Sequence, residues 1–125
     1  MRVPGVARDD ATAEFFDGTA AGVYLLRRCD RGHISKPQAL QCSVCSGQEL
    51  EWVPASGEAR LVSWAVLPAA ESPVVAVAEL KEGPWIWAAL FCEDPSGLRD
   101  GMELRIAFER PEGSEAIPVL VPPTG

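Results

Sequence analysis

Four metal-binding side chains at short spacing constrain this chain more than any other feature of its sequence. Cys42 and Cys45 form a C-x-x-C pair, and Cys29 lies four residues before the only histidine, His33. A C-x-x-C turn lets two thiolates bind one tetrahedral ion. The combined pattern, C-x3-H-x8-C-x2-C, predicts that these four side chains hold one zinc ion per chain.

The segment around these ligands, residues 23–51, has too few apolar side chains to build a core of its own. We therefore expect a metal to stabilise it as a zinc-ribbon-like unit. Gly32 stands where a standard ribbon has a cysteine, and His33 would replace that ligand. Three alternatives stay open: a degenerate loop without metal, an iron–sulfur cluster, or a disulfide between Cys42 and Cys45.

Charge is divided unevenly along the 125 residues, which carry 18 acids, 11 bases and a formal net charge of −7. Residues 27–36 contain one acid among four bases, which are Arg27, Arg28, Arg31 and Lys36. From residue 52 onward, eleven acids oppose five bases. Nucleic acids and anionic membranes bind broad basic surfaces, so we expect neither as a partner.

Targeting signals and cysteine usage point to a cytoplasmic protein. No apolar run approaches the roughly 18 residues of a membrane span. The first 16 residues lack the hydrophobic centre of an export signal. Cysteines in such a chain fit metal binding or burial better than disulfides. Cys92, outside the metal motif, is expected as a small buried hydrophobe, because the base that a nucleophile needs is absent beside it.

Residues 9–22 predict a short helix with Asp9 or Asp10 as its N-cap and a glycine at its end. Its apolar side is thin and consists mainly of Phe15 and Phe16. These two rings would either pack on their own domain or dock onto a partner chain. Both interpretations stay open.

Five short strands are predicted between residues 58 and 121. Alternating or β-rich stretches recur over 58–67, 73–80, 85–91, 102–108 and 116–121, with turns rich in glycine and proline between them. Apolar residues occupy both faces of these strands. A small closed barrel buries both faces better than an open sheet, so a barrel is the predicted architecture.

Four tryptophans raise the question of base stacking, because aromatic side chains in barrel grooves can bind single-stranded nucleic acid. Such grooves are basic, whereas this barrel region is acidic. We therefore favour core or interface roles, with Trp85 and Trp87 on one face of a strand as candidates for a partner contact. With one histidine and no glycine-rich phosphate loop, the chain does not resemble a self-sufficient enzyme.

The order of these parts resembles a family of small acyl-CoA-associated proteins with a rubredoxin-like zinc ribbon and a C-terminal OB-fold, long called a domain of unknown function. The matching stretches are AEFFDGTAAGVYLLRRC, PQALQCSVCSGQELEWVPASGEARLVSWAVL and DPSGLRDGMELRIAFE, which together cover most of the chain. The absence of a cysteine at Gly32 departs from the family pattern. The resemblance implies an N-terminal segment with a short helix (1–22), a ribbon (23–51) and a five-stranded OB-type Greek-key barrel (52–125).

Members of this family commonly associate with thiolase-like proteins that hold the catalytic residues. The resemblance thus implies a non-catalytic accessory subunit of a thiolase or a retro-aldolase acting on acyl-CoA thioesters, with steroid side-chain cleavage as one specific role. It also implies a heterotetramer of two plus two chains. The basic side chains that would suit the phosphates of coenzyme A are Arg27, Arg28, Arg31 and Lys36. The candidates for the partner interface are Phe15, Phe16, Trp85 and Trp87. Competing functions are a nucleic-acid-binding OB module and a stand-alone acyl-CoA binder.

Overall fold

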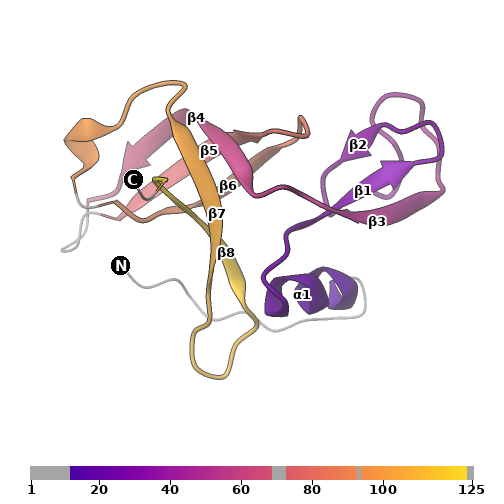
Figure 1. The fold of residues 1–125 in the computed structure, drawn as a ribbon, viewed down its shortest axis with the longest axis horizontal. Helices are drawn as coiled ribbons and strands as arrows, with labels where there is room; N and C mark the ends of the chain where they lie inside the picture. Colours follow the sequence, from indigo (N-terminus) through magenta and orange to yellow (C-terminus); the bar gives the residue numbers. More distant parts are fainter. Residues whose placement is uncertain (1–11, 69–72, 93, 124–125) are drawn as a thin grey trace.

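The structure is a computed structural model that describes residues 12–68, 73–92 and 94–123 (Figure 1). In this part of the chain one short helix is followed by a three-stranded sheet and then by a closed five-stranded barrel. The expected mainly β fold with a five-stranded barrel is therefore confirmed. No helix among the described residues has the length and apolar character needed to cross a membrane.

Helix α1 (Ala13–Ala20) is shorter than the predicted helix, and the two aspartates expected to cap it lie outside the described residues. Glu14 lies in its first turn, where a carboxylate interacts favourably with the positive end of the helix dipole. The helix ends before Gly22, whose φ of +78° lets the chain turn into the first strand.

The ribbon consists of three antiparallel strands in the order β2-β1-β3. Their bounds are β1 (Leu25–Cys29), β2 (Ile34–Ser35) and β3 (Leu50–Pro54). Arg27 on β1 pairs with Ser35 on one side and with Trp52 on the other. The loop between β2 and β3 returns beside the β1–β2 turn, and this arrangement brings the two halves of the metal motif together.

The barrel closes in the order β4-β5-β6-β8-β7, with β7 pairing back onto β4. Its strands are β4 (Glu58–Val66), β5 (Val74–Leu80), β6 (Trp85–Leu90), β7 (Glu103–Glu109) and β8 (Ile117–Val121), with a short 3-10 helix η1 (Pro95–Gly97) before β7. All pairs are antiparallel except β6 with β8, which meet at Leu90 and Leu120. This strand order is that of a five-stranded OB-fold Greek-key barrel.

One irregularity changes which side chains of β4 face the core. Strict alternation would place Leu61 and Ser63 on the same face, but the register against β5 shifts between these two residues. Leu61 is therefore buried opposite Ala78, whereas Ser63 is exposed opposite Val77. The bulge bends β4 so that its second half continues away from β7.

The ribbon and the barrel share one hydrophobic core. Tyr24 and Leu26 belong to the same buried cluster as the barrel residues, which include Leu61, Ala78, Leu80, Leu104 and Leu120. The connection is reinforced by hydrogen bonds, because the N–H of Ser56 donates to Glu82 Oε2 at 2.8 Å and Arg110 donates to the carbonyl of Ala20 at 3.0 Å. The shared core thus holds the ribbon against the barrel, and the two hydrogen bonds hold the linker after β3 and helix α1 against it.

Candidate metal centre

The four predicted ligands converge at the end of the ribbon. Cys29 is the last residue of β1, His33 directly precedes β2, and Cys42 and Cys45 lie in the loop before β3. The turn from Cys29 to His33 is tight, since the N–H of Cys29 donates to the carbonyl of His33 and the N–H of Gly32 to that of Cys29, both at 3.0 Å. Gly32 has a φ of +88°, a conformation that explains glycine at this position.

The ligand atoms of these four residues all lie within 4.8 Å of one another. The separation from His33 Nδ1 is 3.4 Å to the Sγ of Cys29 and 3.5 Å to the Sγ of Cys42, and the Cys45 and Cys29 sulfurs are 3.9 Å apart. A tetrahedral zinc ion with ordinary Zn–S and Zn–N bonds would place sulfurs about 3.8 Å apart and nitrogen about 3.6 Å from sulfur. The arrangement fits a zinc knuckle.

Backbone amides surround the Cys42 sulfur. The N–H groups of Val44 and Cys45 point at it, with N···S distances of 3.3 and 3.5 Å. The bond from Cys45 is the largest of the effects that lower the pKa of the Cys42 thiol, to about 6. A thiol with that pKa is largely thiolate at neutral pH, which is the form that binds metals.

The Cys45 thiol shows the opposite tendency. A hydrogen bond from the backbone of Gly47 lowers its pKa, but the neighbouring Cys42 and Cys29 sulfurs together with burial raise it more. Several thiolates at this distance repel one another, so the cluster without a cation favours protonation of one member. A divalent ion would remove that repulsion, which is the electrostatic reason why such a cluster accepts a metal.

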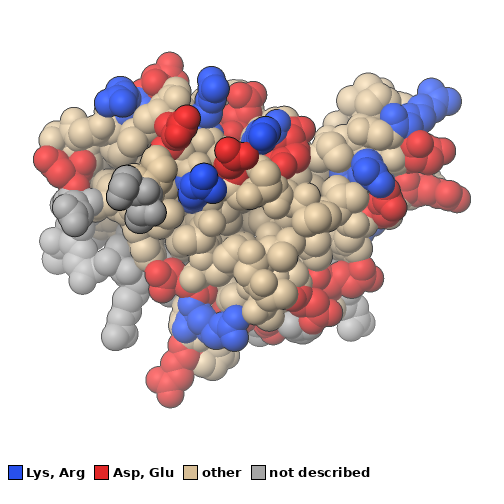
Figure 2. Space-filling view, viewed as in Figure 1, with Lys and Arg blue, Asp and Glu red and all other residues tan. Residues whose placement is uncertain are grey.

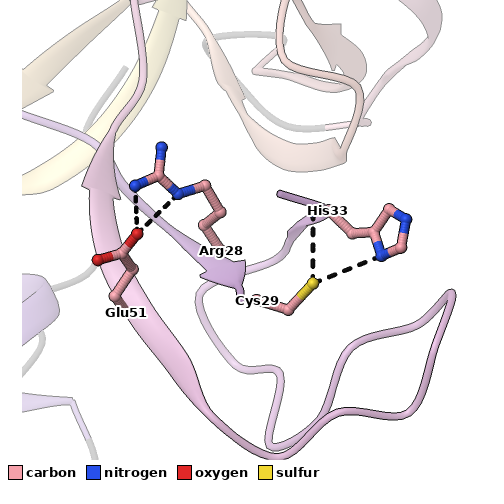
Figure 3. Close-up of polar contacts among 4 residues, drawn as sticks. All are labelled: Arg28, Cys29, His33 and Glu51. Atoms are coloured by element: carbon pink, nitrogen blue, oxygen red, sulfur yellow. Dashed lines mark hydrogen bonds and ion pairs between the residues drawn. The ribbon is translucent and has the colours of Figure 1, made fainter. Parts of the chain in front are cut away.

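The basic side chains near the knuckle are not equally available to a ligand. Figure 3 shows Arg28 turned toward Glu51, and the Arg28 Nε donates to Glu51 Oε1 at 2.7 Å in an exposed ion pair. The guanidinium of Arg27 lies 4.2 Å from the centre of the Trp52 ring. Arg31 and Lys36 are exposed. Sequence reasoning missed Glu51 and Trp52 because each meets its arginine only through the register of β1 with β3.

The proposed interface aromatics separate into two groups. Phe16 is only 8% exposed, and the ring of Phe15 packs at 5.3 Å from both Phe16 and Tyr24 in edge-on contacts. Both side chains take part in packing inside the chain, and a contact of these two residues with a partner stays a prediction. Trp85 and Trp87, by contrast, are 48% and 75% exposed on β6.

The barrel surface carries charges of both signs and is acidic rather than basic. Figure 2 shows Lys and Arg side chains interleaved with Asp and Glu over the visible face. A groove of about 470 Å³ on β4, β5 and β7 contains three acids and three bases, namely Glu58, Glu79, Glu103, Arg60, Lys81 and Arg105. Lys81 pairs with Glu58 at 3.2 Å. This groove lacks the basic surplus that a phosphate backbone requires.

Cys92 lies outside the cluster and is partly buried against the barrel core. Burial, and secondarily the negative charge of Asp94, raise the pKa of its thiol. The thiol therefore stays protonated at neutral pH and lacks the character of a nucleophile.

Comparison with known proteins shows which proteins this chain resembles. Residues 52–109 match the family model described as ChsH2, C-terminal OB-fold domain. A DUF35 domain-containing scaffold protein from Pyrococcus furiosus is 26% identical over 90 residues, and the match spans 66% of each chain, about two thirds of that relative's length. The barrel of this chain thus resembles the C-terminal OB-fold domain of ChsH2, and the chain is similar to DUF35 proteins.

Two solved structures share the DUF35 fold. A chain of the Ltp2-ChsH2(DUF35) aldolase superposes with a TM-score of 0.78 at 24% identity, covering 96% of this chain and 98% of that one. A DUF35-family protein of unknown function from Sulfolobus solfataricus gives a TM-score of 0.62 at 18% identity, with 78% and 77% of the two chains covered. The first match extends over nearly the whole chain, so the two proteins share the arrangement of ribbon and barrel.

Proposed function

We propose that this chain is a non-catalytic accessory subunit of an enzyme that makes or breaks carbon–carbon bonds in acyl-CoA thioesters. The observation that carries this proposal is the nearly full-length likeness to a chain of the Ltp2-ChsH2(DUF35) aldolase. The relative described as a scaffold protein supports the same role. The only histidine of the chain is one of the four clustered ligands, which leaves no histidine for general-base catalysis elsewhere.

The proposed partner is a thiolase-like protein that supplies the catalytic residues. Either a thiolase or a retro-aldolase reaction, including cleavage of a steroid side chain, is compatible with this subunit, because the partner's residues determine the chemistry. The exposed Trp85 and Trp87 are the proposed docking residues, since large aromatic side chains are enriched in protein interfaces. A partner that is itself a two-fold dimer would bind one copy on each side and give two plus two chains.

The proposed metal is one zinc ion held by Cys29, His33, Cys42 and Cys45. Four protein ligands complete a tetrahedral shell, and a closed shell is the property of structural rather than catalytic zinc. Bound zinc would cross-link β1 to the loop before β3. The chain would thereby hold Arg27, Arg31 and Lys36 in fixed positions near the knuckle, where they are proposed to contact the phosphates of coenzyme A. Arg28 contributes less, because Glu51 already neutralises it.

The test is co-expression of the full chain with a thiolase-like protein of its own source organism, followed by size-exclusion chromatography and an acyl-CoA cleavage assay. The pair should co-elute and be active together. Trp87→Lys should weaken co-elution by at least about tenfold, the effect of losing an interface hot spot. The matched control is Leu40→Lys, a change at an 88% exposed residue of the ribbon, which should leave co-elution intact. If no thiolase-like protein co-elutes with the unmodified chain, the accessory role is wrong.

A further inference from the structure

Strand β4 extends beyond its pairing with β7 on one side of the strand. It pairs with β5 as far as Val66, but with β7 only from Glu58 to Arg60. The last bonds on the β7 side come from Leu61, whose N–H donates to Met102 and whose carbonyl accepts from Gly101. Figure 1 shows β4 continuing past its crossing with β7.

The pairing register of β4 with β5 shows which backbone groups of β4 point toward the side where β7 no longer pairs. The N–H of Leu67 donates to Pro73 at 2.8 Å, in the same register that pairs Ala65 with Val75. Hydrogen-bonded pairs alternate along an antiparallel ladder. The N–H and carbonyl groups of Trp64 and Val66 therefore point away from β5, and no residue in the described part of the chain bonds them.

This free edge lacks the features that usually prevent strands from associating. Trp64, Val66 and Leu67 are 36%, 47% and 41% exposed, and residues 61–67 contain no charge and no proline. Exposed edge strands are normally protected by a lysine, a proline or a covering segment. An uncharged, β-branched and aromatic edge such as this one pairs readily with another strand.

We propose that a second copy of this chain pairs with the free edge, so that two β4 strands run antiparallel across a two-fold axis at Ala65. In this register Trp64 lies opposite the partner's Val66, and the same contact occurs twice. Aromatic and β-branched side chains are a favourable cross-strand pair. Trp64 and Val66 would each exchange backbone hydrogen bonds with the other copy, and Ala65 places the smallest side chain where the two strands approach most closely.

The charge of the chain is compatible with a second copy as the partner of this edge. Two copies bring together two chains of net charge −7, but no charged residue lies on the paired edge itself. Acids farther away than about 8 Å are largely screened at physiological ionic strength. A partner of opposite charge is not required, and the edge is complementary to itself.

This contact is independent of the proposed function. It uses β4, whereas the proposed docking residues Trp85 and Trp87 lie on β6. A failure of one surface therefore leaves the other intact.

The first experiment is sedimentation of the full chain alone, from about 1 μM to about 1 mM, a range that brackets weak and moderate dissociation constants. We expect a monomer–dimer equilibrium. Val66→Lys should raise the dissociation constant by at least about tenfold, because an edge lysine blocks strand pairing. Val44→Lys, the same change at a 69% exposed ribbon valine, and Trp87→Lys should leave the equilibrium unchanged.

The second experiment tests the register of the two β4 strands. It does not depend on whether the fold tolerates a lysine at residue 66. In a Cys92→Ser background, Ala65→Cys should form a disulfide-linked dimer on mild oxidation, because directly opposite residues of a non-hydrogen-bonded pair lie about 4.5 Å apart at Cα, within disulfide range. Ser63→Cys should not, since it would lie opposite the partner's Leu67. A chain that stays monomeric throughout the range, a dimer insensitive to Val66→Lys, or equal cross-linking by both cysteine variants would overturn the proposal.

Discussion

At the residue scale, the chemistry of the ribbon depends most on Cys42. It is 1% exposed, and two backbone N–H groups already point at its sulfur. The backbone is thus arranged for a thiolate before any ion arrives, which reduces the cost of deprotonating the ligand. Gly32, which departs from the usual ribbon pattern, does not remove a ligand, because the turn that it permits brings His33 into the cluster.

Replacing Cys42 should therefore remove the metal. We expect Cys42→Ser to lower zinc affinity by more than the roughly 10- to 100-fold that loss of an outer-shell partner costs. Cys92→Ser is the matched control and should retain about one zinc per chain, as measured by elemental analysis of protein purified under reducing conditions. Equal zinc contents in both variants would contradict the ligand assignment.

The buried hydroxyl group of Tyr24 makes the free energy of unfolding depend on pH in the alkaline range. Burial raises its pKa from 10.0 to about 12 in the folded chain. The unfolded chain then loses this proton at a lower pH than the folded chain, so the stabilisation is complete below pH 10 and is lost as the pH rises toward 12. The loss contributes about 2–3 kcal/mol. Tyr24→Phe should abolish this contribution between pH 9 and 12 in urea titrations.

Because Tyr24 is the only tyrosine, its ionisation can also be followed directly by tyrosinate absorbance. An absorbance midpoint near pH 10 in the folded protein would show that the hydroxyl is not buried as described.

At the element scale, α1 is held against β1 at Gly18. A Cβ atom added there would lie 2.7 Å from both Cγ and Cδ1 of Leu25 and 3.1 Å from the carbonyl oxygen of Val23. Alanine favours the helix over glycine by about 1 kcal/mol. Overpacking typically costs about 1–3 kcal/mol, and the close Cγ and backbone atoms cannot simply rotate away.

Gly18→Ala should therefore destabilise the protein by about 1–2 kcal/mol despite the gain in helix propensity. Leu25→Ala in the same chain should recover most of this loss, which a double-mutant cycle in urea would measure as a favourable coupling. A stabilised Gly18→Ala single variant would mean that α1 is not packed against β1 at this point.

The elements also show how far the sequence could predict the fold. All five barrel strands occur within two residues of the predicted stretches, because alternation and turn residues are local signals. The ribbon strands were not predicted. β2 has two residues, and Arg27 and Arg28 interrupt the apolar pattern of β1. The bulge after Leu61 was also missed, since it is defined by pairing with β5 and not by residue type.

The candidate site also has features that the sequence could predict and features that it could not. Cys29, His33, Cys42 and Cys45 could be predicted because their spacing is part of the motif, and they do lie together. The environment of the basic residues could not, because Glu51 is 23 residues from Arg28 and meets it only across the sheet. For Phe15 and Phe16, a short apolar pattern does not distinguish packing within the chain from docking outside it.

At the scale of the whole molecule, the ribbon and the barrel are stabilised by different means. The barrel closes on itself around fully buried leucines, which include Leu61, Leu80, Leu104 and Leu120. The outer part of the ribbon, residues 30–49, contributes only Ile34 to the hydrophobic core, and that side chain is only partly buried there. The barrel core should thus survive conditions that disrupt the loops around the knuckle.

Removal of the metal tests whether the ribbon and the barrel are stabilised by different means. After treatment with a strong chelator, hydrogen exchange measured by mass spectrometry should become fast in residues 30–49, because four clustered ligands would lose their cross-link. Exchange should stay slow in β5 and β6, which pair with each other over six residue pairs from Val74 to Glu79 and from Trp85 to Leu90. Tyr24 and Leu26, which pack against the barrel, should keep β1 partly protected. The Cys42→Ser variant should reproduce the pattern without chelator. Simultaneous loss of protection in the ribbon and the barrel would instead mean that the shared core makes the chain one cooperative unit, with the metal stabilising all of it.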